Sequence, residues 1–177
     1  MDGWVDLHVG ISDLATFIAD YSPHSKLTIE GRTFNPTVSN PQTSITLADY
    51  TEIEGSSTQL TIEGNFPNIE HITIGNYAFK SVNRFIIIGR YFAKTLTIGD
   101  YAFTRHKLNY KELSNREFII QQCSFERIQI GSISFVDFSN IVLSELYNLK
   151  ELIIGKKYQD SANFFYAKNI VIQGRSI

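Results

Sequence analysis

An eight-residue segment recurs along the chain, and this repeat constrains the fold more than any other feature. It reads ITIGNYAF at Ile72–Phe79 and LTIGDYAF at Leu96–Phe103, and it returns with more substitutions at Ile128–Phe135 and Leu152–Gln159. A weaker copy stands at Ile45–Glu52. Steps of 27, 24, 32 and 24 residues separate the central residues Thr46, Thr73, Thr97, Gln129 and Ile153. Such a period predicts a solenoid, in which each repeat buries its apolar side chains against its neighbours.

A second set of short apolar segments lies between the copies of the first. Its members are Leu27–Gly31, Leu60–Gly64, Phe85–Gly89, Phe118–Gln122, Ile141–Glu145 and Ile170–Gly174. The segments of both sets are short and rich in β-branched residues, and a glycine often follows, which favours strands. The intervals leave little room for helices. We therefore expect two parallel ladders of strands around a filled interior, ladder A from the first set and ladder B from the second.

Alternation along each strand predicts which side chains point inward. In ladder A the inward pairs are Ile45/Leu47, Ile72/Ile74, Leu96/Ile98, Ile128/Ile130 and Leu152/Ile154. In ladder B they are Leu27/Ile29, Leu60/Ile62, Phe85/Ile87, Phe118/Ile120, Ile141/Leu143 and Ile170/Ile172. Phe79, Phe103 and Phe135 recur at one place after the ladder A strands and are expected to stack as a column.

The outward side chains provide the candidate binding surface. Ladder A is expected to present His71, Thr73, Thr95, Thr97, Arg127, Gln129, Glu151 and Ile153. These residues are mixed in charge and moderately polar, as in a non-obligate protein interface. Ladder B is expected to present an apolar stripe of Ile86, Ile88, Ile119 and Val142, which either contacts a partner or is covered by side chains from neighbouring loops.

One repeat is eight residues longer than its neighbours, and the extra residues fall within Thr104–Arg116. Insertions in solenoids form loops and often bind partners, although a charged loop is often only solvated. The basic residues of this insertion are Arg105, His106, Lys107, Lys111 and Arg116. We count the first four among the candidate partner-binding residues.

The two ends of the chain differ from the repeats. Residues 1–26 lack the repeat and are expected to form an N-terminal cap, with a short helix at Ile11–Tyr21, while the solenoid spans 27–177. The chain ends just after a ladder B strand, which predicts an open C-terminal edge. Self-association through this edge or through the ladder B stripe is one expected outcome.

At the level of motifs the chain resembles the leucine-rich repeats. The run L-x-x-L-x-I-G stands at Leu149–Gly155 and, with substitutions, at Ile69–Gly75, Ala93–Gly99 and Phe125–Gly131. The pattern Ile-Gly-x-x-Ala-Phe at Ile74–Phe79 and Ile98–Phe103 resembles the BspA-like subfamily, and Ala102–Phe135 is similar to its protist members. The resemblance implies a right-handed solenoid with ladder A on the concave face. It also implies protein recognition, and some members are described as surface or adhesion proteins.

Other features bear on classes of function. The net charge of −2 and the pI near 6.1 argue against nucleic-acid binding. The one cysteine, Cys123, is expected to be core filler, and no catalytic, metal or cofactor motif stands out. A β-helix carbohydrate enzyme would need converging acids, but Glu70, Glu126 and Glu151 share their positions with the lysines Lys94 and Lys150. An ice or crystal binder would need the threonine column to continue past Thr97, and it does not.

These observations lead to one main expectation. The chain should be an all-β, right-handed, leucine-rich-repeat-like solenoid with two parallel ladders and a small N-terminal helical cap. It should act as a non-catalytic protein-recognition or scaffolding module, without cofactor or membrane span. Alternatives are a structural building block or adhesin that uses exposed strands and the open end, and then a carbohydrate-active enzyme. The start of the sequence has no signal-peptide pattern, so cytoplasmic location is expected, or surface exposure if the chain belongs to a longer protein.

Overall fold

The fold consists of strands joined by turns. In the computed structural model the described residues are 6–7, 26–29, 32–34, 44–52, 58–63, 70–89, 93–105, 115–157 and 161–174. Among them no helix occurs. The helix expected at Ile11–Tyr21 lies outside these residues.

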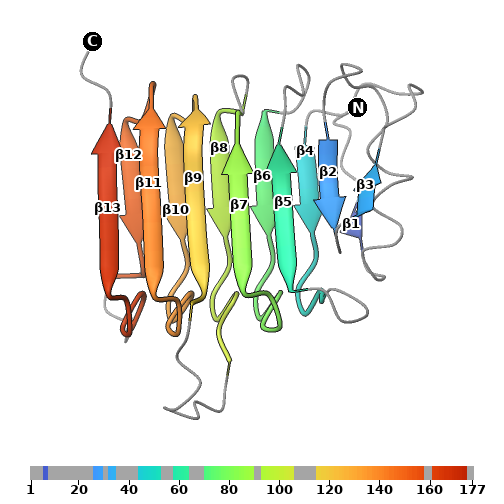
Figure 1. Cartoon of the computed structure of the whole chain (residues 1–177), viewed down its shortest axis with the longest axis vertical. Coiled ribbons are helices and arrows are strands. Elements are labelled where there is room, and N and C mark those ends of the chain that lie inside the picture. Colours follow the sequence, from blue (N-terminus) through green and yellow to red (C-terminus); the bar gives the residue numbers. More distant parts are fainter. Residues whose placement is uncertain are drawn as a thin grey trace.

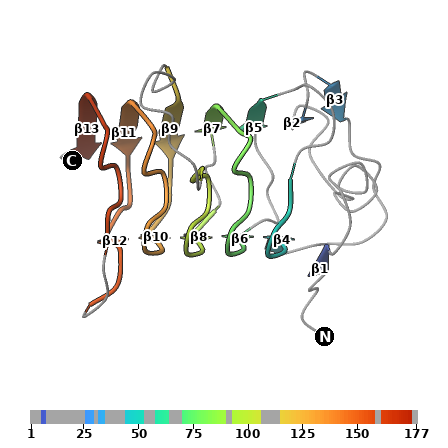
Figure 2. The same cartoon turned by 90° about the horizontal axis from the view of Figure 1, so that it is seen from below.

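The strands form two sheets that face each other, and from β3 onward the chain passes alternately from one to the other (Figures 1 and 2). Ladder A contains β1 (Asp6–Leu7), β4 (Ser44–Leu47), β6 (His71–Ile74), β8 (Thr95–Ile98), β10 (Arg127–Ile130) and β12 (Glu151–Ile154), in that spatial order. Ladder B contains, in spatial order, β3 (Arg32–Phe34), β2 (Lys26–Ile29), β5 (Gln59–Glu63), β7 (Arg84–Ile88), β9 (Glu117–Cys123), β11 (Asn140–Leu146) and β13 (Asn169–Gly174). The expected parallel-strand solenoid is confirmed.

The N-terminal end departs from the expected pattern. Strand β2 lies in ladder B as expected, but it pairs antiparallel with both β3 and β5, so the prediction of a parallel strand at Leu27–Ile29 is wrong. Two residues separate β2 from β3, and so short a link can join only antiparallel neighbours, which accounts for the β2–β3 pair. Strand β1, which falls within the expected cap, extends ladder A by pairing parallel with β4.

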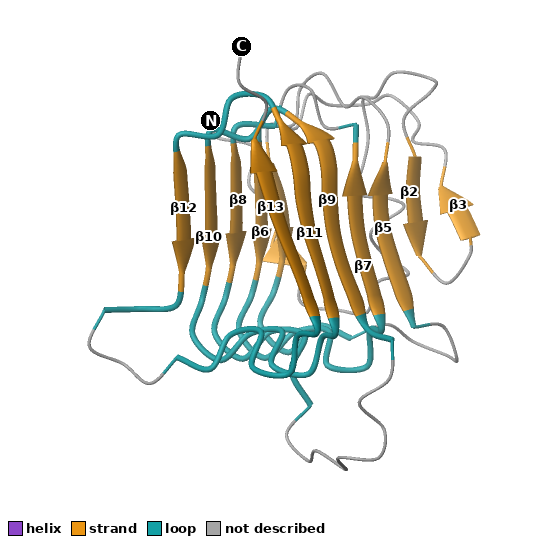
Figure 3. Cartoon of the chain, turned by 60° about the vertical axis from the view of Figure 1, so that its left-hand side comes forward, coloured by secondary structure: helices purple, strands orange, loops and turns teal. Residues whose placement is uncertain are grey.

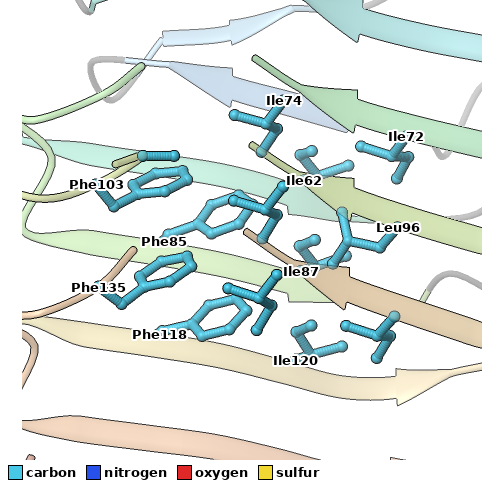
Figure 4. Close-up of a cluster of buried hydrophobic side chains, with 14 of the residues drawn as sticks. Ile62, Ile72, Ile74, Phe85, Ile87, Leu96, Phe103, Phe118, Ile120 and Phe135 are labelled. Atoms are coloured by element: carbon cyan, nitrogen blue, oxygen red, sulfur yellow. The ribbon is translucent and has the colours of Figure 1, made fainter. Parts of the chain in front are cut away.

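The core lies between the two inner faces (Figure 4). The predicted inward pairs from β4 to β11 are all buried, with at most 2% of any side chain exposed. The last coil differs, because no described strand lies beyond β12 or β13. Leu152 is half-buried, and Ile154, Ile170 and Ile172 are 39%, 50% and 49% exposed. The prediction that these four side chains are buried in the core is therefore wrong.

The expected phenylalanine column is confirmed. The ring centroids of Phe79 and Phe103 lie 5.4 Å apart, and those of Phe103 and Phe135 lie 4.7 Å apart. The ladder B residues Phe85 and Phe118 intercalate with this column, at 4.6 Å from Phe103 and 4.2 Å from Phe135 respectively. Stacked aromatic side chains therefore fill one corner of the solenoid (Figure 4).

The turns that follow the ladder A strands also stack from coil to coil. A Cβ atom on Gly75, Gly99 or Gly131 would lie 2.4 to 2.6 Å from the backbone of the preceding coil, so only glycine allows this approach. Side-chain oxygens extend the stack, since Asp100 N donates to Asn76 Oδ1 and Ser132 N donates to Asp100 Oδ1, both at 2.8 Å. These contacts hold successive coils at one fixed spacing.

Candidate binding surface

The outer face of ladder A contains all eight residues predicted there. Strands β6, β8, β10 and β12 pair in register, so His71, Thr95, Arg127 and Glu151 form one column. Thr73, Thr97, Gln129 and Ile153 form the adjacent column. Arg127 and Glu151 are exposed and the other six are partly exposed. The register therefore places the predicted residues in two adjacent columns on four strands that lie side by side (Figure 3).

Hydrogen bonds and ion pairs connect the side chains of this face. The Nδ1 atom of His71 lies 2.8 Å from Thr95 Oγ1, in a bond whose direction depends on the tautomer. Arg127 Nη1 lies 3.2 Å from Glu151 Oε2, and Arg127 Nη2 donates to Gln129 Oε1 at 3.3 Å. Much of the polarity of the face is thus satisfied within the chain.

A row of alternating charge borders the same face, at the residues that precede the strands. Lys94 Nζ lies 2.9 Å from Glu70 Oε1, and Lys150 Nζ lies 2.7 Å from Glu126 Oε2. The hydrogen bond from Lys150, followed by its charge, lowers the pKa of Glu126. Glu70 and Glu126 are therefore paired with lysines from adjacent coils. No group of three or more His, Cys, Asp or Glu residues that could hold a metal ion occurs within the described part of the chain.

The threonine column is in register as expected, with Thr46 opposite Thr73 and Thr73 opposite Thr97. It continues as Gln129 and Ile153, so the regular array covers only three coils. Thr46 Oγ1 is buried without a hydrogen-bond partner.

Both stems of the insertion are anchored to the solenoid. On the first stem, Thr104 Oγ1 donates to Ile133 O at 2.7 Å and Arg105 Nη2 donates to Asn83 Oδ1 at 2.7 Å. The second stem is held by Arg116. His106, Lys107 and Lys111 lie outside the described residues.

Arg116 is not one of the solvated loop charges that the sequence suggested. It is 2% exposed, and its guanidinium lies 2.5 Å from Asp137 Oδ2 and 4.3 Å from the centre of the Phe138 ring. It also donates to the carbonyl oxygens of Val82 and Lys80. Burial lowers the pKa of Arg116 to about 10, and the attraction to Asp137 offsets only part of this shift. Arg116 is thus a structural residue that fixes the insertion to two other coils.

The ladder B stripe is less exposed than predicted. Ile86 is only 8% exposed, so it is not available as a contact, and Ile88, Ile119 and Val142 are half-buried. Ile86 lies between Thr61 and Ile119 in the middle of the sheet, and Thr61 is buried as well. From Thr61 to Val142 no residue at this register position is exposed, whereas Val171, on the last strand, is exposed.

The last coil has most of the exposed large hydrophobic side chains among the described residues. Six large hydrophobic side chains are exposed among the described residues. Five of them belong to the last coil, namely Ile154, Phe165, Ile170, Val171 and Ile172. We call this set the end patch. The sequence predicted an open edge but not the contribution of Phe165, which is 68% exposed.

A shifted corner residue explains why Phe165 was missed. In the last coil the corner of the core is filled by Phe164, whose ring lies 5.9 Å from that of Phe135. Ala167 N donates to Phe164 O at 2.9 Å, as Phe138 N does to Phe135 O at 3.2 Å. Five more residues than in the other coils separate Phe164 from its ladder A strand. An aromatic residue followed three positions later by an apolar one was the signal that could have found it.

Comparisons with protein-family models, with curated proteins and with solved structures find no match to this chain. None of the described segments is a helix that is long and apolar enough to cross a membrane.

Proposed function

We propose that this chain is a non-catalytic protein-binding module, and that its principal docking surface is the end patch of the last coil. The observation that carries the proposal is the concentration of exposed hydrophobic side chains on one coil, five of the six in the described residues. Exposed apolar side chains concentrated in one part of a folded chain are typical of protein contact sites.

Backbone chemistry favours a protein as the occupant. Strands β12 and β13 are the last described strands of their sheets, so each has one side without a paired strand. A partner that adds a strand to either edge satisfies these backbone groups and covers the aliphatic side chains in the same step. Burying an aliphatic side chain fully stabilises a complex by about 1.5–3 kcal/mol before the costs of association.

The outer face of ladder A, together with the insertion, is a second candidate surface. A specific observation favours it: the insertion stems are fixed by Thr104, Arg105 and Arg116, and a loop held on a rigid scaffold is a common recognition element. The internal pairing of this face makes it the weaker candidate, because a partner would have to compete with the existing bonds.

A dye that fluoresces on exposed apolar surface tests the end patch. The double variant Ile170→Lys/Ile172→Lys should lose most of the dye signal. The matched control is Tyr50→Lys, because Tyr50 is 66% exposed but lies in another coil. Hydrogen exchange should show fast exchange at β13 and slow exchange at β9. An unchanged dye signal in the double variant, or equal protection of β13 and β9, would rule out an open docking end.

We further propose that the solenoid is right-handed and of the BspA-like leucine-rich-repeat type, with a helical cap at its N-terminal end. The repeated turn supports this proposal, since Tyr77 and Tyr101 both have φ of 57° and Phe79 and Phe103 both have φ of 56°. Backbone chemical shifts of residues 11–21 would test the helix.

A further inference from the structure

The end patch continues the buried columns of the interior. Ile154 is in register with Ile130, and Ile170 and Ile172 are in register with Ile141 and Leu143. Those interior residues are fully buried by the coils on either side of them. The open end therefore has the apolar cross-section that the solenoid covers elsewhere with another coil of its own kind.

The opposite end of the solenoid has the strand directions needed to provide that coil. Strand β3 is antiparallel to β2, which is antiparallel to β5, so β3 runs in the same direction as β13. Strand β1 is parallel to β4 and hence to β12. If a second copy is translated along the solenoid axis until its β3 lies beside β13, ladder B continues with a parallel pair at the junction (Figure 1). Ladder A has six strands and ladder B has seven, so β1 of the second copy then lies one strand position further from β12.

The sequence segments that contain the two ends also have opposite charge. Residues 1–63, which include every strand from β1 to β5, contain nine acidic and two basic residues, a formal charge of −7. Residues 64–177 contain nine acidic and fourteen basic residues, a formal charge of +5. Within residues 150–177 there are five basic and two acidic residues, so the end patch belongs to a cationic segment. Charges of opposite sign favour encounter between unlike ends and disfavour contact between like ends.

We propose that the partner at the end patch is a second copy of this chain, bound head to tail with β13 against β3. This inference rests on the proposed function, because it names the occupant of the same surface. Tail-to-tail pairing is the rival arrangement, but it joins two cationic ends and makes both junctions antiparallel. A head-to-tail contact uses two different surfaces and does not close after two copies, so association is open-ended.

Cysteine cross-linking distinguishes the two arrangements. Val171 and Thr33 occupy the same register position on the two end strands, linked through Thr28, Thr61, Ile86, Ile119 and Val142. The native Cys123 is buried. Val171→Cys and Thr33→Cys are made in separate chains and treated with a short bismaleimide, singly and mixed. Circular dichroism melts of each variant establish that it is folded.

We expect the mixture to give several-fold more covalent dimer than either variant alone, and the yield to fall several-fold at high salt. We also expect Ile172→Lys, added to the Val171→Cys chain, to abolish the dimer. A dimer from Val171→Cys alone would show tail-to-tail contact and overturn the proposal. The proposal would also be overturned if the mixture gave no cross-linked dimer and light scattering at the same concentrations reported a monomer. In that last case, loss of dye signal in Ile170→Lys/Ile172→Lys would leave the protein-docking function standing, whereas an unchanged signal would reject both.

Discussion

The coil made by β8 and β9 and the coil made by β12 and β13 contain similar strands but differ in burial. In the first, the inward residues Leu96, Ile98, Phe118 and Ile120 are at most 1% exposed. In the second, the residues at the same register positions are half-buried or exposed, up to 50% at Ile170. Burial in a solenoid is thus set by the neighbours of a coil and only in part by its own sequence.

The difference extends to the polar contacts. Interior coils share bonds with two neighbours, as Glu117 does when its Oε2 accepts from Arg84 Nε at 2.8 Å and its Oε1 accepts from Asn140 at 3.4 Å. Lys150 and Glu151, in the last coil, have their described ion pairs with the preceding coil alone. The last coil is therefore the natural place for a new contact, and the interior coils provide stability.

The largest difference between the two regions should come from the aromatic column. Phe135→Ala should destabilise the fold by about 3–5 kcal/mol, because it leaves a cavity among five other phenylalanine rings. Phe165→Ala, in the last coil, should cost less than about 1 kcal/mol, since that ring is mostly exposed. Urea unfolding followed by circular dichroism measures both. Equal losses would contradict the distinction between interior and end.

Breaking the buried ion pair of the interior should cost more stability than breaking the exposed ion pair of the last coil. Arg116→Ala leaves Asp137 buried without its cation and should cost about 3–5 kcal/mol, whereas Glu151→Ala, at the exposed pair with Arg127, should cost about 0–1 kcal/mol. The double variant Arg116→Met/Asp137→Leu should recover most of the loss, because burial of the guanidinium is itself unfavourable. Thermal and urea unfolding test this. A double variant no more stable than Arg116→Ala would refute it.

Spacing and alternation predicted the ladders, the inward faces and the phenylalanine column, because a two-residue period fixes which side chains share a side of a sheet. The eight outward residues of ladder A were located by the same rule. The direction of strand β2 could not be predicted by analogy with the repeat. Its sequence pattern is that of the parallel strands, but only two residues connect it to β3.

Burial of individual side chains was harder to predict. Arg116 stands among polar residues in the sequence, and its contacts are with Asp137, 21 residues later, and Val82, 34 residues earlier. Ile86 points outward by alternation and is nevertheless buried in the middle of ladder B. Long-range packing of this kind leaves no local pattern in a single sequence.

Glycines test how closely the coils are stacked. Gly99→Ala should destabilise the chain by about 1–3 kcal/mol, because the new Cβ would lie 2.6 Å from the backbone of the preceding coil. Gly174→Ala, on the last strand, meets nothing within 4 Å and should change stability by no more than about 0.5 kcal/mol. Melting temperatures of the two variants give the comparison. If Gly99→Ala were as stable as the parent, the close stacking of the turns would be wrong.

The smallest effect concerns Glu126, which lies between an interior coil and the last one. Its pKa is lowered chiefly by the hydrogen bond and the charge of Lys150, and least by the charge of Lys94. A carboxylate with a lowered pKa in the folded state stabilises the fold above its ordinary pKa, and this contribution is lost as pH falls through the folded value. Lys150→Ala should therefore raise the pKa of Glu126 towards its ordinary value, and Lys94→Ala should raise it less. Carbon-detected NMR titration of the side-chain carboxyl measures both. A larger rise with Lys94→Ala would mean that the interior coil, and not the last one, holds this side chain.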